Sequence, residues 1–220
     1  LELQKADREE LAKNLPHLPA VETILLKTEL PDPELVSWLH RAFPQIGLFY
    51  ALADRDVPLD ADAAMLSLNQ CPLTLELAQK LIQCYPVLRE AELLECGLTE
   101  EELRQLCDDT PQVFFLWDGS FGPVQLRTDA VEADLSRIPV TDLEALEQAL
   151  PYYPKLQKVD LSDCGLENEE LDALNKRHEN VRFVWTVNVG AVRVRTDSLF
   201  FAPVKTGQTV YEGQLDNLRY

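Results

Sequence analysis

The sequence predicts an α/β repeat solenoid made of three units of about 67 residues, each ordered helix, strand, helix, strand, strand. The first observation is that Cys96-Gly97-Leu98 returns 68 residues later as Cys164-Gly165-Leu166. The second is that the flanking residues recur at the same distance: Tyr85-Pro86 with Tyr153-Pro154, Glu102-Leu103 with Glu170-Leu171, Trp117 with Trp185, and Arg127-Thr128-Asp129 with Arg195-Thr196-Asp197. Self-similarity at a fixed period is the signature of repeat architectures.

The 220 residues are therefore expected to form one repeat domain in which each copy packs on its neighbours. Copy 1 spans residues 8–73, copy 2 spans 74–140 and copy 3 spans 141–208, and residues 209–220 are expected to start a further repeat. Copy 1 is the most diverged. It retains Glu34-Leu35, Tyr50 and Asp62 at the matching places.

Copy 2 shows the order of elements best. The helical spacing of Leu77, Leu81 and Ile82 predicts a helix that opens at Thr74. A short strand is expected over residues 88–94. The turn that follows needs Gly97, which can adopt backbone conformations closed to other residues.

The second half of copy 2 predicts a helix followed by a hairpin. Thr99-x-x-Glu102 matches a capping box, so a helix is expected from there to the neighbourhood of Thr110. Residues 113–117 predict a strand, Asp118-Gly119 a turn, and residues 124–127 a second strand. Together these signals favour a β-hairpin.

The other two copies predict equivalent elements. In copy 1, Asp32 as N-cap and Pro33 in the first turn predict a helix. Copy 3 predicts a helix capped by Thr141-x-x-Glu144, a strand over 156–161, a helix over 168–176, and strands over 181–189 and 191–195.

Two segments match the consensus of a leucine-rich repeat: Leu156-x-x-Val159-x-Leu161-x-x-Cys164-x-Leu166 and Leu88-x-x-Ala91-x-Leu93-x-x-Cys96-x-Leu98. With Phe183-Val184-Trp185-Thr186-Val187 and Arg195-Thr196-Asp197, the chain resembles leucine-rich-repeat proteins of Gram-positive gut bacteria. The match covers residues 74–200 well and 8–73 loosely. The resemblance implies a leucine-rich-repeat fold and a cell-surface or other extracytoplasmic location, and it names no ligand.

Composition bears on the classes of partner. Lys and Arg total 20 against 38 Asp and Glu, a net charge of −18, and such a surface repels phosphate backbones, so no nucleic acid is expected. No run of about 18 apolar residues occurs, so no transmembrane segment is expected. The five cysteines are expected to be small buried residues, and a disulfide framework is the less favoured interpretation.

The sequence does not favour an enzyme. Cys164 with His178 can be drawn as a nucleophile and base, but Cys164 occupies the turn position of a repeat, which is a structural role. There is no Gly-rich phosphate loop, no Cys-x-x-Cys and no cluster of histidines, so no cofactor and no metal are expected.

Two sets of recurring residues allow both a functional and a structural interpretation. Asp62, Asp129 and Asp197 form either a periodic set of ligands or turn residues that accept backbone N–H groups, and the second is favoured. Tyr50, Trp117 and Trp185 form either a stacking platform or an aromatic layer of the core, and again the second is favoured. With Cys96, Gly97, Cys164 and Gly165, the residues Trp117, Trp185, Asp129 and Asp197 are taken as structural repeat positions.

The candidate binding residues are basic side chains that gather in copy 3: Lys155, Lys158, Arg182, Arg193 and Arg195. They form either a basic face for an acidic partner or ion pairs with neighbouring carboxylates. The predicted function is a non-enzymatic binding or scaffolding module that contacts a protein or peptide through the sheet face. The alternative is a structural spacer that displays downstream repeats on a cell-surface protein. A binding module should expose a contiguous apolar patch, whereas a spacer should be polar throughout.

Overall fold

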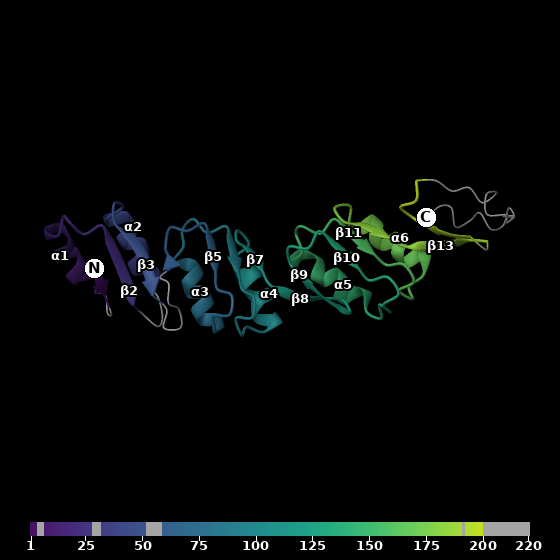
Figure 1. Cartoon of the computed structure of the whole chain (residues 1–220), viewed down its shortest axis with the longest axis horizontal. Helices are drawn as coiled ribbons and strands as arrows, with labels where there is room; N and C mark the ends of the chain where they lie inside the picture. Colours follow the sequence, from purple (N-terminus) through teal and green to yellow (C-terminus); the bar gives the residue numbers. More distant parts are fainter. Residues whose placement is uncertain (4–6, 28–31, 52–58, 191, 200–220) are drawn as a thin grey trace. The chain divides into compact units, whose positions relative to one another are not determined.

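A computed structural model describes residues 1–3, 7–27, 32–51, 59–190 and 192–199. These residues form a mixed α/β structure with six α-helices and several small sheets, which confirms the α/β part of the predicted fold (Figure 1). The expected start of a further repeat at 209–220 lies outside the described residues.

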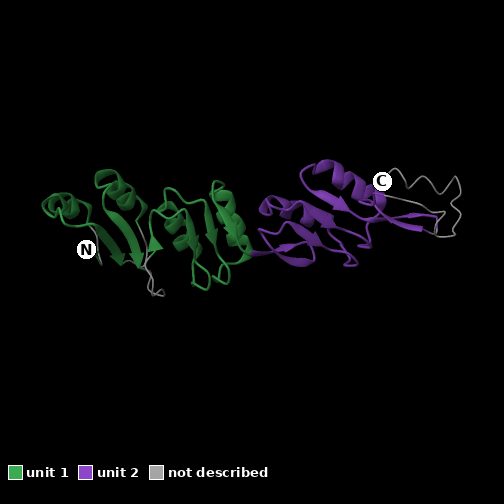
Figure 2. Cartoon of the chain, turned by 45° about the horizontal axis from the view of Figure 1, so that its top comes forward, with its two compact units in different colours: residues 1–117 green, residues 118–220 purple. Residues whose placement is uncertain are grey.

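The chain divides into two compact units, which we call unit 1 (residues 1–117) and unit 2 (residues 118–220) (Figure 2). The division falls inside copy 2, between Trp117 and Asp118. The predicted single domain and the copy boundaries near residues 73 and 140 stay predictions.

Unit 1 begins with a four-stranded sheet in the order β1-β2-β3-β4. The first three strands are parallel, and β4 is antiparallel to β3. Its elements are β1 (Glu2–Leu3), α1 (Arg8–Asn14), the 3-10 helix η1 (Leu15–His17), β2 (Thr23–Lys27), α2 (Pro33–Ala42), β3 (Gly47–Ala51) and β4 (Leu59–Asp60). Helix α2 begins as predicted, because the Asp32 carboxylate accepts the backbone N–H groups of Glu34 and Leu35.

The rest of unit 1 is a parallel sheet in the order β5-β6-β7, with one helix in each connection. Its elements are β5 (Met65–Ser67), α3 (Leu75–Gln83), β6 (Glu90–Glu92), α4 (Glu100–Asp109) and β7 (Phe114–Leu116). The predicted capping box is present at the start of α4. Glu102 N–H donates to Thr99 Oγ1 at 3.3 Å, and Thr99 N–H donates to Glu102 Oε2 at 2.8 Å.

Unit 2 contains a parallel sheet in the order β10-β11-β12 and two β-hairpins, β8–β9 and β13–β14. Its elements are β8 (Asp118–Phe121), β9 (Val124–Arg127), β10 (Glu132–Asp134), α5 (Leu143–Ala149), the 3-10 helix η2 (Leu150–Tyr152), β11 (Lys158–Asp160), α6 (Asn168–Arg177), β12 (Arg182–Val184), β13 (Thr186–Val189) and β14 (Val192–Arg195).

The core of unit 2 lies on one face of this sheet. Ala133, Val159 and Phe183 occupy one register row and are buried in the same cluster as Leu146 of α5 and Leu174 of α6. Successive side chains of a strand point to opposite faces, so the residues on either side of this row project from the other face. That second face of the sheet is where the functional side chains must be sought.

The predicted hairpin turn at Asp118-Gly119 is wrong. Both residues belong to β8, and the chain reverses at Gly122, which has a φ of +59°. Phe121 is fully buried in the core of unit 2, and burying this ring fixes β8 as a strand. The turn-forming composition of Asp118-Gly119 was therefore outweighed by the burial of Phe121, two residues after Gly119.

Other element boundaries also differ from prediction. The copy 3 helix is capped by Asp142, whose Oδ1 accepts Ala145 N–H at 2.9 Å, and Thr141 is not the cap. The predicted strand over 181–189 divides at Trp185, because β12 pairs in parallel with β11 whereas β13 pairs antiparallel with β14. The short strands β5 and β10 were not predicted, so the order of elements is strand, helix, strand, helix, strand and hairpin.

All five cysteines are free thiols. Cys71, Cys84, Cys96 and Cys164 are buried, and Cys107 is partly buried. Burial raises the pKa of the Cys96 and Cys164 thiols, so both stay protonated near neutral pH. Gly97 and Gly165 follow them with φ values of +84° and +90°, which explains the glycine at these turns.

Candidate functional site

The exposed face of the unit 2 sheet is covered by charged side chains. The register places Glu132, Lys158 and Arg182 in one row across β10, β11 and β12, and Asp134 beside Asp160 in another. We call these five residues the charged face. In β10 and β11 the alternation along the strand puts these residues opposite the core, and in β12 Arg182 is exposed whereas Val184, the register partner of Asp160, is buried.

Two more predicted residues contact the strand β11: Arg195, the last residue of β14, and Asp197, which lies two residues after it. Arg195 Nη1 donates to Asp160 Oδ2 at 2.6 Å, and Arg195 Nε donates to Asp197 Oδ1 at 2.9 Å. Lys158 Nζ lies 3.4 Å from Asp197 Oδ2. Two cations and two carboxylates thus hold one another in a fixed arrangement.

These contacts set the protonation states of the cluster. The hydrogen bond from Arg195, opposed by partial burial and reinforced by Lys158, lowers the pKa of Asp197 to about 2. Hydrogen bonds to Asp197 and Asp160 raise the pKa of Arg195. Asp197 and Arg195 are therefore both ionised over the physiological range.

The other predicted basic residues have different surroundings. Arg193 is paired with Asp163. Arg182 is exposed and makes no ion pair with any residue in the described part of the chain. Lys155 lies three residues before β11 and lines a separate groove. The structure thus brings Arg193 and Arg195 to the carboxyl end of β11, links Lys158 to them through Asp197, and places Lys155 elsewhere.

A pocket of about 570 Å³ opens at the carboxyl ends of β10 and β11. We call it the strand-end pocket; it is lined by Ser136, Arg137, Ser162, Asp163, Thr186, Arg193 and Arg195. Arg137 was not predicted from the sequence. The signal that could have found it is the recurrence of Asp134-Leu135-Ser136-Arg137 as Asp160-Leu161-Ser162-Asp163, one strand later.

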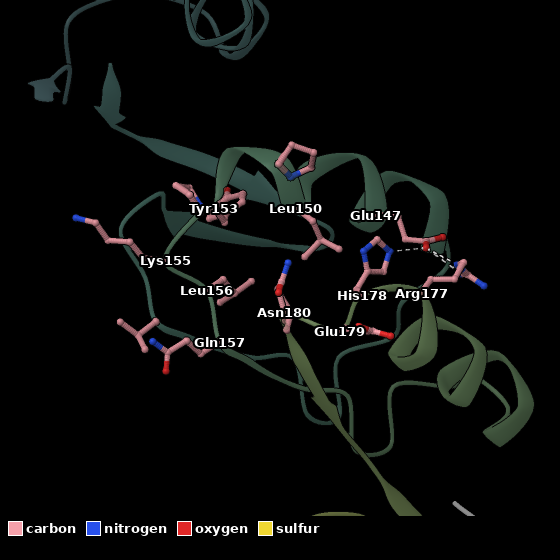
Figure 3. Close-up of a pocket in the computed structure, with 14 residues that line it drawn as sticks. Glu147, Leu150, Tyr153, Lys155, Leu156, Gln157, Arg177, His178, Glu179 and Asn180 are labelled. Atoms are coloured by element: carbon pink, nitrogen blue, oxygen red, sulfur yellow. Dashed lines mark hydrogen bonds and ion pairs between the residues drawn. The ribbon is translucent and has the colours of Figure 1, made fainter. Parts of the chain in front are cut away.

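A larger groove of about 960 Å³ lies at the opposite ends of the same strands (Figure 3). Val131, Gln157 and Val181, each of which immediately precedes a strand of the sheet, line it. Leu150, Pro151 and Leu156 add apolar surface. The groove is therefore partly apolar and open to solvent.

Three charged or titratable groups meet at the rim of this groove, as Figure 3 shows. Arg177 Nε donates to Glu147 Oε1 at 2.9 Å, and His178 Nε2 lies 2.8 Å from the same oxygen. The Arg177 hydrogen bond, opposed by burial and reinforced by His178, lowers the pKa of Glu147. A carboxylate held ionised in this way is a poor proton donor.

The contact at the rim links two helices. In unit 1, Gln79 Nε2 donates to Asp109 Oδ2 at 3.0 Å, and these residues lie 68 positions before Glu147 and Arg177. In unit 1 the two helices are therefore linked by an amide-to-carboxylate hydrogen bond, and in unit 2 the equivalent helices are linked by an ion pair. This supports a structural role for Glu147, which the sequence did not reveal.

Cys164 and His178 do not form a catalytic pair. Cys164 precedes α6 and His178 caps its C-terminus, so the ten residues of the helix separate them. A rise of 1.5 Å per residue makes that separation about 15 Å. Cys164 is also buried with a raised pKa, which is the opposite of what an activated thiol needs.

The recurring aspartates differ from the favoured interpretation. Both carboxylate oxygens of Asp129 accept from Arg127, at 2.7 and 2.6 Å, and Asp197 likewise binds Arg195. At the ends of strands, the carboxylates that accept a backbone N–H two positions later are those of Asp60, Asp134 and Asp160. The recurring Arg-Thr-Asp motif is therefore an arginine clamp, because a guanidinium fork matches both carboxylate oxygens.

The recurring aromatic residues lie inside the core. Tyr50, Trp117 and Trp185 are all buried. Trp185 Nε1 donates to Asn168 Oδ1 at 3.2 Å, and Trp185 N–H donates to Thr196 Oγ1 at 3.1 Å. A buried ring cannot serve as an exposed stacking platform, so the structural interpretation accounts for these residues.

We expect Asp197→Asn to destabilise the protein in a pH-dependent way. The folded pKa of Asp197 is about 2, below its unfolded value of 3.8. The ionised carboxylate therefore contributes stability above about pH 4, and this contribution is lost as the pH falls toward about 2. Urea titrations of the wild type and the variant should differ most near neutral pH and converge in acid.

Substitution of the exposed Asp118 by asparagine serves as the control for this experiment. A difference between wild type and Asp197→Asn that stays constant from neutral pH to about pH 2 would show that the Arg195 clamp does not stabilise the folded state.

Comparisons with known proteins found no match: no family model, no curated protein and no solved structure matches this chain. Among the described residues, no three His, Cys, Asp or Glu side chains come together as a group that could hold a metal ion. Within the same part of the chain, every helix is too short or too polar to cross a membrane.

Proposed function

We propose that the chain is a non-enzymatic binding module, built from leucine-rich-repeat-like copies, that contacts a protein or peptide partner through the charged face of unit 2. The repeat part of the proposal is supported by the positions of the elements. Helices α4 and α6 begin 68 residues apart, as do β6 and β11, β7 and β12, and the two hairpins. The resemblance to exported bacterial proteins leads us to propose a cell-surface location.

The observation that carries the binding function is the fixed charge pattern on a rigid sheet. Lys158 and Arg195 are held by Asp160 and Asp197, so their donors are ordered before any partner arrives. Arg182 lies beside Lys158 in the register and stays exposed. Preorganised polar groups reduce the entropy lost on binding, and charge complementarity selects the partner.

A display selection tests this proposal. A peptide library is panned against the immobilised full chain, and each enriched peptide is measured against Lys158→Glu/Arg182→Glu and against Lys176→Glu. Lys176 is an exposed lysine of α6 that pairs with Asp172, so Lys176→Glu is a charge reversal of the same kind at a site away from the sheet. We expect binding to weaken about tenfold or more only in the sheet variant, because two favourable charges become repulsive.

Either of two results would contradict the proposal. Enriched peptides that bind all three proteins equally would place the binding surface elsewhere. A selection that enriches no specific peptide would favour the alternative function, a structural spacer.

One observation favours that alternative. The large hydrophobic side chains that are exposed among the described residues come from separate places in the chain: Leu1, Leu18, Met65, Val87, Val131 and Leu199. Apolar residues exposed singly are normal on any protein and do not mark an interface. None of these six residues belongs to the charged face, so binding there would depend on charge and hydrogen bonds, and a spacer would need neither.

A further inference from the structure

We propose that the strand-end pocket of unit 2 binds the side-chain carboxylate of an acidic peptide segment, with Arg137 as its main cation. The inference rests on the proposed function and names the chemistry of the partner. It places the specific contact at the edge of the charged face, where the loops after β10 and β11 meet β14.

The first argument is the composition of the pocket. Three arginines and three hydroxyl groups line it, against one carboxylate, that of Asp163. Arginine and hydroxyl donors are the groups that recognise oxyanions, and the planar guanidinium fork matches a carboxylate in particular. The carboxyl ends of parallel strands are also where α/β proteins commonly bind ligands.

The second argument is the balance of charge. Asp163 pairs with Arg193, and Asp160 and Asp197 pair with Arg195 and Lys158. Arg137 is exposed and has no ion-pair partner among the described residues, so it is the cation of the pocket that no carboxylate holds. Its backbone is held in place, since Arg137 N–H donates to Ser162 O at 2.7 Å.

The charge balance also selects the ligand. One unbalanced cation suits a monoanion. A phosphate dianion would add a second negative charge beside Asp160, Asp163 and Asp197. A carboxylate is therefore the oxyanion that the pocket fits best. The guanidinium groups of Arg193 and Arg195 keep unused N–H donors, because each has five.

The third argument is an unused hydroxyl. Ser162 is 6% exposed and lines the pocket, and its Oγ makes no hydrogen bond of normal geometry among the described residues, although the Asp160 carboxylate lies near it. A buried polar atom without a partner costs free energy unless a ligand or water supplies one. A carboxylate oxygen in the pocket would provide that partner.

The equivalent turn of unit 1 supplies a matched variant. Gln70 lies 67 residues before Arg137 and has a similar backbone, with a φ of +56° against +63°. Arg137→Gln therefore introduces a residue that this turn already accommodates. It removes the unbalanced charge without demanding a new backbone conformation.

The test measures binding of a blocked peptide in which glutamate alternates with glycine. The arginine Nε–Hε resonances of the full chain are followed by NMR as the peptide is added, and a glutamine-for-glutamate peptide and inorganic phosphate form separate arms. We expect saturable shifts of the pocket arginines with the glutamate peptide alone. Arg137→Gln should weaken binding about tenfold, and Ser162→Ala severalfold. Lys176→Gln, which removes one charge on α6, should change it less than twofold.

Three results would overturn the proposal. They are an absence of saturable shifts at the pocket arginines, equal weakening by Lys176→Gln, and tighter binding of phosphate than of the glutamate peptide. Failure here is distinguishable from failure of the proposed function. If selected peptides lose affinity for the Lys158→Glu/Arg182→Glu variant but not for Arg137→Gln, the pocket proposal is refuted and the proposal of binding at the charged face is retained.

Discussion

Replacing Trp185 with alanine is expected to lower the free energy of unfolding of unit 2 by about 3–5 kcal/mol. The side chain is 3% exposed and belongs to the main core cluster of the unit. Trp185 also lies between β12, which pairs with β11, and β13, which pairs with β14. Truncation would leave a cavity and would leave Asn168 Oδ1 without its indole donor.

Urea unfolding followed by circular dichroism measures this loss. Trp185→Phe keeps most of the apolar volume and should cost less, whereas Trp38→Ala removes a half-buried tryptophan from unit 1 and serves as the control. A loss below about 1 kcal/mol for Trp185→Ala would show that the ring does not support the core.

Replacing Phe121 with alanine should destabilise unit 2 by a similar amount, about 3–5 kcal/mol. Phe121 is fully buried in the core of unit 2 and packs edge-on against Tyr153, with ring centroids 5.0 Å apart. If the turn were at Asp118-Gly119, as the sequence predicted, this ring would lie in a loop and its loss would cost little.

A double-mutant cycle isolates the contact between the two rings. Phe121→Ala and Tyr153→Leu should be coupled by about 0.5–1.5 kcal/mol, the range typical of aromatic pairs. Phe121→Ala with Leu11→Ala of α1, a buried residue of unit 1, provides the uncoupled control. Additive effects of Phe121→Ala and Tyr153→Leu would contradict the packing described for the hairpin β8–β9.

Helices could be predicted from the sequence because their signals are local. Asp32, Thr74 and Thr99 each begin a helix as expected, since a cap needs only a side chain and the two or three N–H groups that follow it. The exception is informative. Thr141 and Asp142 are both good caps, and only the tertiary structure decides that Asp142 accepts the N–H.

Strands were harder to predict because each contributes so few residues. Strands β5 and β10 have three residues with one inward side chain, Leu66 or Ala133, so no alternation can be read from them. The hairpin β8–β9 was misplaced because Gly119 has the composition of a turn, while its position is set by the burial of Phe121. Such long-range packing leaves no mark in a short window of sequence.

The candidate site was predicted only in part. The sequence indicated Lys158, Arg182 and Arg195 as candidate basic residues, but the pairing of Arg195 with Asp160 joins residues 35 positions apart. Glu147 stands alone in the sequence and Arg137 is indicated only by the recurrence of its turn, so both acquire a context only when loops and helix ends meet. The charge balance of the pocket depends on these tertiary contacts, so no local sequence motif indicates it.

The most direct test of the binding function is hydrogen–deuterium exchange of the full chain, with and without a peptide from the display selection. Binding at the charged face and its edge should slow exchange in residues 158–163, 182–190 and 192–195, with helices α5 and α6 unchanged, because the helices cover the opposite face of the sheet. Protection confined to α5 and α6, or to unit 1, would contradict the proposal that this protein binds its partner through the exposed sheet face of unit 2.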